Sequence, residues 1–393
     1  MGNQELRFAS RFDGITGSAI REILGMLGKP GMISFGGGNP ASDTLEEGVI
    51  AALAERVLAR DGKAILQYGA TEGYAPLKEA LCDWLENFGF RPRPEEVLPI
   101  TGSTQGIDLV AKALIDPGDV VLVENPSFLG ALQVFRLYQA KLIPAPTDGG
   151  GLLLEEAERL IQQHKPKILY VIPTFQNPTG VTLAAERRGP LAQMAARHGV
   201  LVLEDDPYRD LRYTGDPLPA VKAYDQEGWV AHLSSFSKII SPGLRCGALA
   251  CHPDLLRKVV IGKQSSDVHT STLTQAIVAD YLRDGRMPGQ LAAIRAMYAA
   301  RMHAMLDQLA AFPKGTRYTK PQGGLFLWAQ LPGGLDAKVV FQRAIERNVA
   351  FVPGAHFFCD GGHTDTLRLN FSNSTPAQID VGMRTLREIL MEN

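Results

Sequence analysis

Ile168-Leu169-Tyr170-Val171-Ile172-Pro173 is a short apolar run, and two similar runs follow it, Val200-Leu201-Val202-Leu203-Glu204 and Val230-Ala231-His232-Leu233-Ser234. A segment with helical spacing, Leu191–His198, lies between the first run and the second. This alternation of apolar runs and helical segments is typical of βαβ units around a mostly parallel sheet. We therefore predict an α/β fold.

Further apolar runs extend this pattern in both directions along the chain. We expect additional strands at Val97–Thr101, Val120–Glu124 and Cys246–Cys251, and helices at Ile107–Ile115 and Glu155–Gln163. The Gly189-Pro190 pair falls inside a helical stretch from Leu183 to His198, where proline removes a hydrogen bond. We expect that helix to be kinked or split.

The C-terminal third of the chain has a different pattern. From Thr272 to about Phe312 the spacing is helical, with a break near Gly285–Gly289, and a strand–helix–strand–helix tail follows. We expect three parts: an N-terminal arm at residues 1–45 that also contributes to a small domain, a large domain at residues 46–285, and a small α+β domain at residues 286–393.

Length and composition exclude several classes of protein. A chain of 393 residues, 45% of them hydrophobic and 21% charged, suits two globular domains. Because 40 basic residues face 42 acidic ones and no long basic run occurs, we do not expect nucleic acid as a partner. No apolar run is long enough for a membrane helix. The four cysteines lack zinc-type spacing and no leader precedes them, so we expect reduced thiols in the cytoplasm.

Four polar segments come at the ends of predicted strands. Open α/β sheets bind their ligands at the carboxyl ends of the strands, so we expect these segments to form one site. They are Thr101-Gly102-Ser103-Thr104-Gln105-Gly106, Asn177-Pro178-Thr179-Gly180, Glu204-Asp205-Asp206-Pro207-Tyr208, and Ser234-Ser235-Phe236-Ser237-Lys238 with Arg245 after it.

Each segment has an ordinary structural reading beside a chemical one. The Ser103 segment is either a helix N-cap or a phosphate site at a helix N-terminus, and Asn177-Pro178 is a turn that needs no function. Asp205 either caps a loop or keeps a pyridine nitrogen protonated. Lys238 is either a surface lysine or a nucleophilic amine, whose ordinary pKa of about 10.4 must fall before it attacks a carbonyl. Arg245 can lower that pKa or hold an anion.

Taken in their order, these segments resemble the fold-type I, class I/II aminotransferases over almost the entire chain. The resemblance implies the PLP-dependent transferase fold, with a mostly parallel seven-stranded sheet in the large domain, and pyridoxal 5'-phosphate (PLP) as the cofactor. Lys238 would form the Schiff base with PLP, Asp205 would pair with its ring nitrogen, and Asn177 and Tyr208 would bond the ring hydroxyl. The other positions that match cofactor-binding residues are Ser103, Thr104, Gln105, Ser235, Ser237 and Arg245 for the phosphate and Phe128 for stacking on the ring.

The same resemblance extends to the substrates and the partner chain. Tyr68 matches a tyrosine that reaches the phosphate across a homodimer interface, and Arg368 matches the arginine that binds the substrate α-carboxylate in bidentate fashion. Within the branch that resembles 2-aminoadipate, kynurenine and broad-range aromatic aminotransferases, Arg21 can meet acidic side chains and Gly38 belongs to a substrate loop. We expect no metal site, although the segment with His356, Cys359, Asp360 and His363 has ligand-type side chains.

The resemblance implies a ping-pong transfer of an amino group between an L-amino acid, such as glutamate, 2-aminoadipate or an aromatic or aliphatic one, and a 2-oxo acid. The same residues also serve β-lyases, racemases and decarboxylases. A third reading is the ligand-sensing domain of a PLP-dependent transcription regulator, which carries a winged-helix region ahead of the enzyme-like part. The segment before Gly36 is too short for such a region, so we expect an enzyme.

Overall fold

The computed structural model describes residues 6–13, 15 and 31–392, and its centre is an eight-stranded sheet with strand order β2-β9-β8-β7-β6-β3-β4-β5. Neighbours from β8 to β4 run parallel, whereas β9 is antiparallel to both of its neighbours. The α/β fold with a mostly parallel sheet is therefore confirmed. The strands are β2 (Val97–Ile100), β3 (Val120–Asn125), β4 (Lys141–Asp148), β5 (Gly151–Leu152), β6 (Ile168–Val171), β7 (Leu201–Asp205), β8 (Val230–Ser235) and β9 (Gly247–Ala250).

The number of strands differs from the expected seven. The additional strand, β5, has two residues and folds back antiparallel on the end of β4. Strand β4 itself has the sequence KLIPAPTD and is only half-buried along most of its length, so no apolar run marks it in the sequence.

Two buried clusters cover the two faces of this sheet because successive side chains of a strand point to opposite faces. Val121, Val123 and Leu203 belong to the cluster that includes α4, whereas Leu122 and Val202 belong to the cluster that includes α6 and α7. The helices of this part are α2 (Glu47–Ile65), α3 (Ala75–Glu86), α4 (Ser103–Leu114), α5 (Leu129–Leu137), α6 (Leu154–His164), α7 (Ala185–His198), α8 (Pro253–Gln264) and α9 (Thr272–Arg283).

We expected the helix to be kinked or split at Gly189-Pro190, and the split is wrong, because α7 is continuous through Pro190. The kink stays a prediction, since a proline inside a helix removes the hydrogen bond of its own N–H. The expected break near Gly285 is present, since the chain leaves α9 after Arg283 and Gly285 adopts a φ of +72°.

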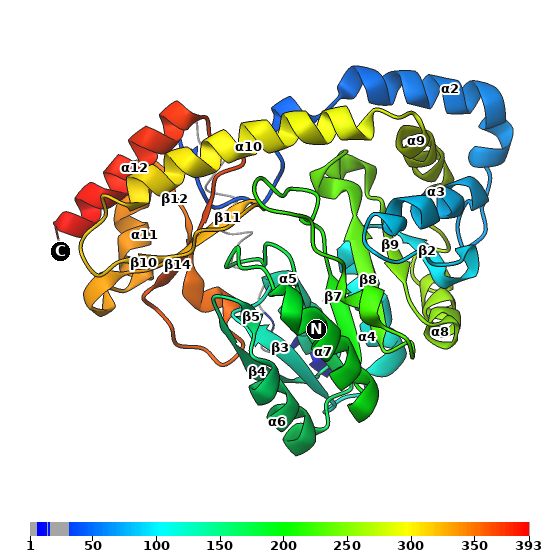
Figure 1. The fold of residues 1–393 in the computed structure, drawn as a ribbon, viewed down its shortest axis with the longest axis horizontal. Coiled ribbons are helices and arrows are strands. Elements are labelled where there is room, and N and C mark those ends of the chain that lie inside the picture. The colour runs from blue at the N-terminus through cyan, green and yellow to red at the C-terminus, as the bar shows by residue number, and fades with distance from the viewer. Residues whose placement is uncertain (1–5, 14, 16–30, 393) are drawn as a thin grey trace, which may run out of the picture.

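A second, four-stranded sheet has the order β10-β11-β14-β13. Figure 1 shows α10 as a long helix that runs along the upper side of the molecule from α12 toward α9. Strand β1 pairs in parallel with β12, so residues 33–34 lie beside the C-terminal part of the chain. The elements here are β1 (Ile33–Ser34), β10 (Arg317–Tyr318), β11 (Phe326–Gln330), β12 (Val349–Ala350), β13 (Val352–Pro353), β14 (Thr366–Asn370), α10 (Met287–Leu309), α11 (Ala337–Glu346) and α12 (Pro376–Met391).

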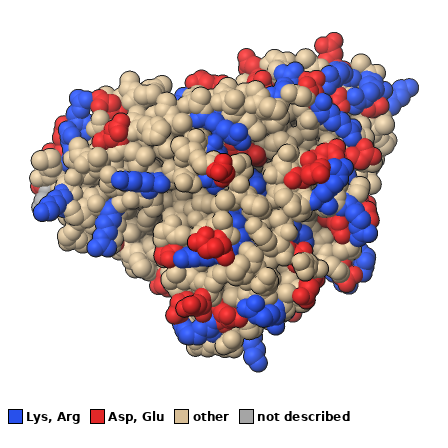
Figure 2. Space-filling view, in the orientation of Figure 1, with Lys and Arg blue, Asp and Glu red and all other residues tan. Residues whose placement is uncertain are grey.

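Short 3-10 helices complete the described elements. They are η1 (Ser10–Phe12), η2 (Ser42–Thr44), η3 (Pro94–Glu96), η4 (Val221–Tyr224), η5 (Phe236–Lys238), η6 (Pro242–Leu244), η7 (Pro332–Gly334) and η8 (Gly354–Phe357). Within the described ranges, no helix has the length and apolar character needed to cross a membrane. On the face shown in Figure 2, basic and acidic side chains lie side by side, and the absence of a nucleic-acid partner stays a prediction.

Gly106 makes the packing of α4 on the sheet testable. A Cβ at this position would lie 2.3 Å from Cδ2 of Leu233 and 2.8 Å from Cδ1 of Ile100, both fully buried. We expect Gly106→Ala to lower the free energy of unfolding by about 1–3 kcal/mol through overpacking. The matched control is Gly62→Ala in α2, where a Cβ meets nothing within 4 Å. This variant should raise the free energy of unfolding by about 0.5–1 kcal/mol. Urea unfolding measures the free energy for both variants, and an equal increase at the two positions would contradict this packing.

Candidate functional site

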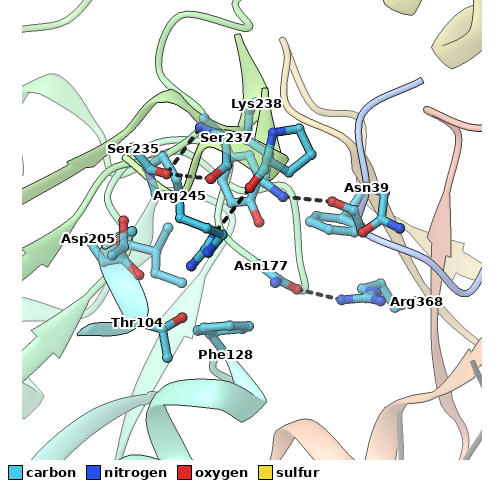
Figure 3. Close-up of a pocket in the computed structure, with 18 residues that line it drawn as sticks. Asn39, Thr104, Phe128, Asn177, Asp205, Ser235, Ser237, Lys238, Arg245 and Arg368 are labelled. Atoms are coloured by element: carbon cyan, nitrogen blue, oxygen red, sulfur yellow. Dashed lines mark hydrogen bonds between the residues drawn. The ribbon is translucent and has the colours of Figure 1, made fainter. Parts of the chain in front are cut away.

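A cavity of about 340 Å³ lies where β6, β7 and β8 end and the second sheet begins. In Figure 3, Asp205, Thr104 and Phe128 lie on one side of this cavity and Arg368 lies on the opposite side. Most residues expected in the site line it, namely Gly38, Ser103, Thr104, Phe128, Asn177, Asp205, Tyr208, Ser235, Ser237, Lys238, Arg245 and Arg368. The polar segments at the strand ends thus form one site, as the strand order requires.

Six other lining residues were absent from the sequence-based set: Asn39, Gly102, Ile172, Pro207, Pro242 and Phe326. Three of them, Asn39, Gly102 and Pro207, are direct neighbours of expected residues, so their adjacency in the sequence could have identified them. Phe326 comes from the distant strand β11, and its ring lies 4.3 Å from the guanidinium carbon of Arg368. Only the pairing of β11 with β14 brings these two side chains together.

Lys238 lies in η5, directly after β8, and its ammonium group is buried in the cavity. Its Nζ donates a hydrogen bond to the carbonyl oxygen of Gly38 at 2.9 Å. Burial disfavours the charged amine and the nearby Arg245 and Arg368 repel it, which together lower the pKa of Lys238 to about 8. Lowering the pKa from the ordinary 10.5 to about 8 raises the fraction of neutral, nucleophilic amine near physiological pH.

The groups around the N-terminus of α4 form an anion site. Gly102 precedes this helix with a φ of +84°, and a Cβ there would lie 2.5 Å from Nη2 of Arg245. The guanidinium of Arg245 donates to the carbonyl oxygen of Thr101 at 3.0 Å, and Ser235 Oγ donates to Ser237 Oγ at 3.0 Å (Figure 3). Ser103 Oγ is buried and has no hydrogen-bond partner among the described residues. Free N–H groups, hydroxyls and a guanidinium fit a phosphate.

Asp205 ends β7 with its carboxylate buried beside the cavity. Its Oδ2 accepts a hydrogen bond from the hydroxyl of Tyr170 at 2.8 Å, while its Oδ1 makes no hydrogen bond of good geometry with the described residues, although the Ser103 hydroxyl lies near the carboxylate and favours its charged form. Burial raises the pKa of Asp205 to about 6. The unpaired oxygen therefore fits a positively charged N–H group, such as a protonated pyridine nitrogen.

Arg368 in β14 is a fully buried cation with aromatic and carbonyl neighbours. It donates to Asn177 Oδ1 at 2.9 Å and to the carbonyl oxygen of Gly36 at 2.8 Å, and its Nε is unpaired among the described groups. The ring of Phe357 lies 5.0 Å from its guanidinium carbon. Burial lowers the pKa of Arg368 to about 10. A buried guanidinium without a carboxylate partner in the described ranges is suited to an anionic ligand.

Two expected residues that the structure describes, Gln105 and Tyr68, do not line the cavity. The side-chain amide of Gln105 is used elsewhere, because its Oε1 accepts from the backbone N–H of Thr101 at 2.8 Å and its Nε2 donates to Asp267 at 2.6 Å. The side-chain amide of Gln105 is therefore occupied, and a role for this residue at the phosphate stays a prediction. Tyr68 is 81% exposed, with its ring edge-on to His269. Arg21 lies outside the described residues.

The ligand-type side chains near His363 have other contacts. Asp360 accepts from Asn125 Nδ2 at 3.0 Å, and the His363 ring stacks on Phe358. The structure instead brings together Glu204, Asp206 and His232, all buried, and His232 Nδ1 lies 3.0 Å from Glu204 Oε2.

Glu124 connects the two loops that bring Phe128 and Asn177 to the cavity. Its buried carboxyl accepts hydrogen bonds from the backbone N–H of Ile172 at 2.9 Å and from Gln176 Nε2 at 3.4 Å. The same Gln176 nitrogen donates to the carbonyl oxygen of Pro126 at 2.7 Å. Burial raises the pKa of Glu124 to about 8, so this carboxyl is mostly neutral at pH 7.

Because this carboxyl is neutral in the folded protein, we expect Glu124→Gln to increase stability by an amount that depends on pH. The folded-state pKa of Glu124 of about 8 lies above the ordinary 4.5, so the wild type loses stability as the pH rises through this window, because only the unfolded chain ionises. Gln stays neutral, so we expect the variant to be more stable by roughly 2–5 kcal/mol at about pH 8 and almost unchanged at about pH 4. Thermal unfolding at both pH values measures the difference. The control is Glu227→Gln, because Glu227 lies in an exposed loop. If Glu124→Gln increased stability equally at both pH values, the Glu124 carboxyl would not be neutral in the folded protein.

Comparisons with known proteins agree with this geometry. The sequence model of the family described as "Aminotransferase class I and II" matches residues 30–386. The chain is 42% identical to the 2-aminoadipate transaminase of Thermus thermophilus, over 96% of this chain and 94% of that one. It is 38% identical to aromatic-amino-acid aminotransferase 1 of Thermococcus litoralis, over 99% and 95%. The crystal structure of alpha-aminoadipate aminotransferase from Thermus thermophilus, complexed with N-(5'-phosphopyridoxyl)-L-leucine, is similar with a TM-score of 0.91 and 41% identity, over 98% of this chain and 97% of that one.

Proposed function

The chain belongs to the aminotransferase class I and II family, and from this premise we propose which of its residues perform each part of the reaction. It is a PLP-dependent enzyme that transfers an amino group between an amino acid and a 2-oxo acid. When bound, PLP supplies a carbonyl that condenses with amines and a ring that withdraws electrons. The observation that carries the assignment of roles is that Lys238, the unpaired Oδ1 of Asp205 and the anion site line a single cavity.

The cofactor roles follow from these positions. Lys238 is the residue that carries PLP, and Asp205 Oδ1 pairs with the protonated ring nitrogen. Asn177 and Tyr208 bond the ring hydroxyl, and Phe128 stacks on the ring. The phosphate is held by Ser103, Thr104, Ser235, Ser237 and Arg245.

The substrate side of the cavity binds and orients the amino acid. Arg368 pairs with the α-carboxylate, which holds Cα close to Nζ of Lys238. Once the substrate amine has displaced it, Nζ accepts the Cα proton, and its lowered pKa raises the fraction of neutral amine available for this step. The reverse sequence on a second 2-oxo acid completes the ping-pong cycle.

We place 2-aminoadipate and aromatic amino acids among the substrates, as the relatives' names suggest, together with glutamate and aliphatic amino acids, which the family resemblance implies. Besides Lys238 and Arg245, Arg368 is the one cation among the described lining residues. An acidic side chain on the substrate therefore needs a further cation, and Arg21 is the candidate. Gly38 leaves room for the substrate, since a Cβ there would lie 3.3 Å from the Phe326 ring.

The proposal includes a homodimer with shared sites. Tyr68 and Leu66 are 81% and 69% exposed in the single chain, which supports contact with a second copy. We also keep the division into residues 1–45, 46–285 and 286–393, supported by the separate eight- and four-stranded sheets. The four free cysteines support a cytoplasmic location.

A panel of amino acids tests the proposed function. Wild-type enzyme with 2-oxoglutarate should form the 2-oxo acid of each good donor, and borohydride should attach PLP to Lys238, as peptide mapping detects. Lys238→Ala should abolish oxo-acid formation, because Lys238 is the one lysine among the described residues that line the cavity, whereas Lys320→Ala on the surface should retain it. Label on a different lysine, or release of carbon dioxide or ammonia without consumption of 2-oxoglutarate, would contradict the proposal.

The proposed role of Arg21 predicts a change of specificity. A bidentate pair with a distal carboxylate contributes roughly 1.5–3 kcal/mol, or about one to two powers of ten. Arg21→Ala should lower kcat/KM for 2-aminoadipate and glutamate by that factor and leave leucine and phenylalanine nearly unchanged. Steady-state kinetics with the four amino acids decides, and an equal loss for all of them would assign Arg21 a structural role instead.

A further inference from the structure

A buried lysine lies directly behind the anion site. Lys263 is in α8, has an exposed fraction of 0%, and does not line the cavity. Its Nζ donates to Gln105 Oε1 at 2.8 Å, to both carboxylate oxygens of Asp267 at 2.9 Å, and to Thr270 Oγ1 at 3.0 Å. An ammonium group has three protons to donate, so this environment satisfies it completely.

The partners of Lys263 lead from this lysine to the cavity. Gln105 Oε1 also accepts from the backbone N–H of Thr101 at 2.8 Å, and Thr101 Oγ1 donates to Asp267 at 3.1 Å. The carbonyl oxygen of the same Thr101 accepts from Arg245 Nη2 at 3.0 Å. A continuous path of hydrogen bonds therefore runs from Lys263 through Gln105 and Thr101 to a guanidinium that lines the anion site.

We propose that Lys263, paired with Asp267, is a positioning residue for the phosphate of the cofactor. The pair fixes the turn from Thr101 to Gln105, and this turn places both Arg245 and the N-terminus of α4. Such an ion pair contributes little net stability, because the cost of desolvation offsets most of the attraction. Removing one of the two residues, however, leaves the other charge and its neighbouring groups without their hydrogen-bond partners. The inference rests on the proposed function, since it requires that the anion site holds the phosphate of PLP.

The same network reaches the exposed side of the chain. The ring of His269, next to Thr270, accepts from the backbone N–H of Gly69 at 3.1 Å and contacts the Tyr68 ring edge-on. Lys263 thus holds this segment at both of its ends, Asp267 and Thr270, and His269 between them supports Tyr68. In the proposed homodimer, one buried lysine would set one phosphate site directly and support the tyrosine offered to the other.

The test compares binding of PLP with binding of pyridoxal, which has the same ring and carbonyl but no phosphate. Lys263→Met should raise the Kd of the full-length enzyme for PLP by roughly 10- to 100-fold, as expected for the loss of one or two charge-assisted hydrogen bonds. The Kd for pyridoxal should change by less than about twofold, because the ring contacts remain. Absorbance titration of cofactor-stripped enzyme measures both constants without any turnover.

Two further variants complete the experiment. Asp267→Asn removes the ion pair at constant size and should show the same selective loss for PLP, which keeps the test valid if Lys263→Met fails to fold. Lys112→Met is the matched control, because Lys112 donates to Ser266 in the same loop from the exposed side and should leave both constants unchanged.

The outcomes separate the inference from its premise. Equal losses for PLP and pyridoxal would mean a general structural role for Lys263, and no loss for either would mean no positioning role, so both results overturn the inference. Wild-type enzyme that binds PLP no better than pyridoxal would instead refute the phosphate site itself, and with it the proposed cofactor contacts.

Discussion

Positive charge that gathers in one cavity without matching anions is the condition on which the rest of this structure depends. Lys238, Arg245 and Arg368 line this cavity, and the one carboxylate among the described lining residues is Asp205. Arg368 is buried, and removing a cation from water costs several kcal/mol, so the fold must supply substitutes for the missing anions. Backbone carbonyl oxygens of Gly36, Gly38 and Thr101 serve that purpose. The phosphate of the cofactor and the carboxylate of the substrate complete the charge balance. Binding of these ligands therefore also stabilises the cations of the cavity electrostatically.

The arrangement of strands decides where these charges meet. Asp205 and Lys238 follow the parallel neighbours β7 and β8, so their positions at one edge of the sheet could be inferred from the order of apolar runs alone. The same argument placed Asn177 after β6 and Ser103 after β2. Arg368 could be assigned only by resemblance, because an arginine in an alternating strand can point to either face. The pairing of β14 with β11 directs it against Phe326 in the cavity.

Features that depend on contacts between distant segments could not be predicted. Gln105 stands in a phosphate-type segment, yet α8 brings Lys263 and Asp267 close enough to engage its whole side-chain amide. Glu124 reads as the last residue of an apolar strand, and only the loop with Gln176 shows what its carboxyl contacts. Pro190 signals a break, yet α7 continues through it. In each case the structure depends on contacts with residues far away in the sequence, and the neighbouring residues in the sequence do not reveal these contacts.

The carbonyl oxygens of Gly36 and Gly38 have a consequence for the energetics of ligand entry. They occupy hydrogen-bond donors of Arg368 and Lys238, the two groups that a substrate carboxylate and the cofactor carbonyl must engage. An incoming ligand therefore exchanges one set of hydrogen bonds for another, and its net gain is smaller than the contacts in the complex suggest. The segment Gly36–Gly38 thus competes with the ligands for these donors, and because it is part of the same chain its effective concentration is high. Such competition weakens the binding of simple anions and favours rapid release of the product.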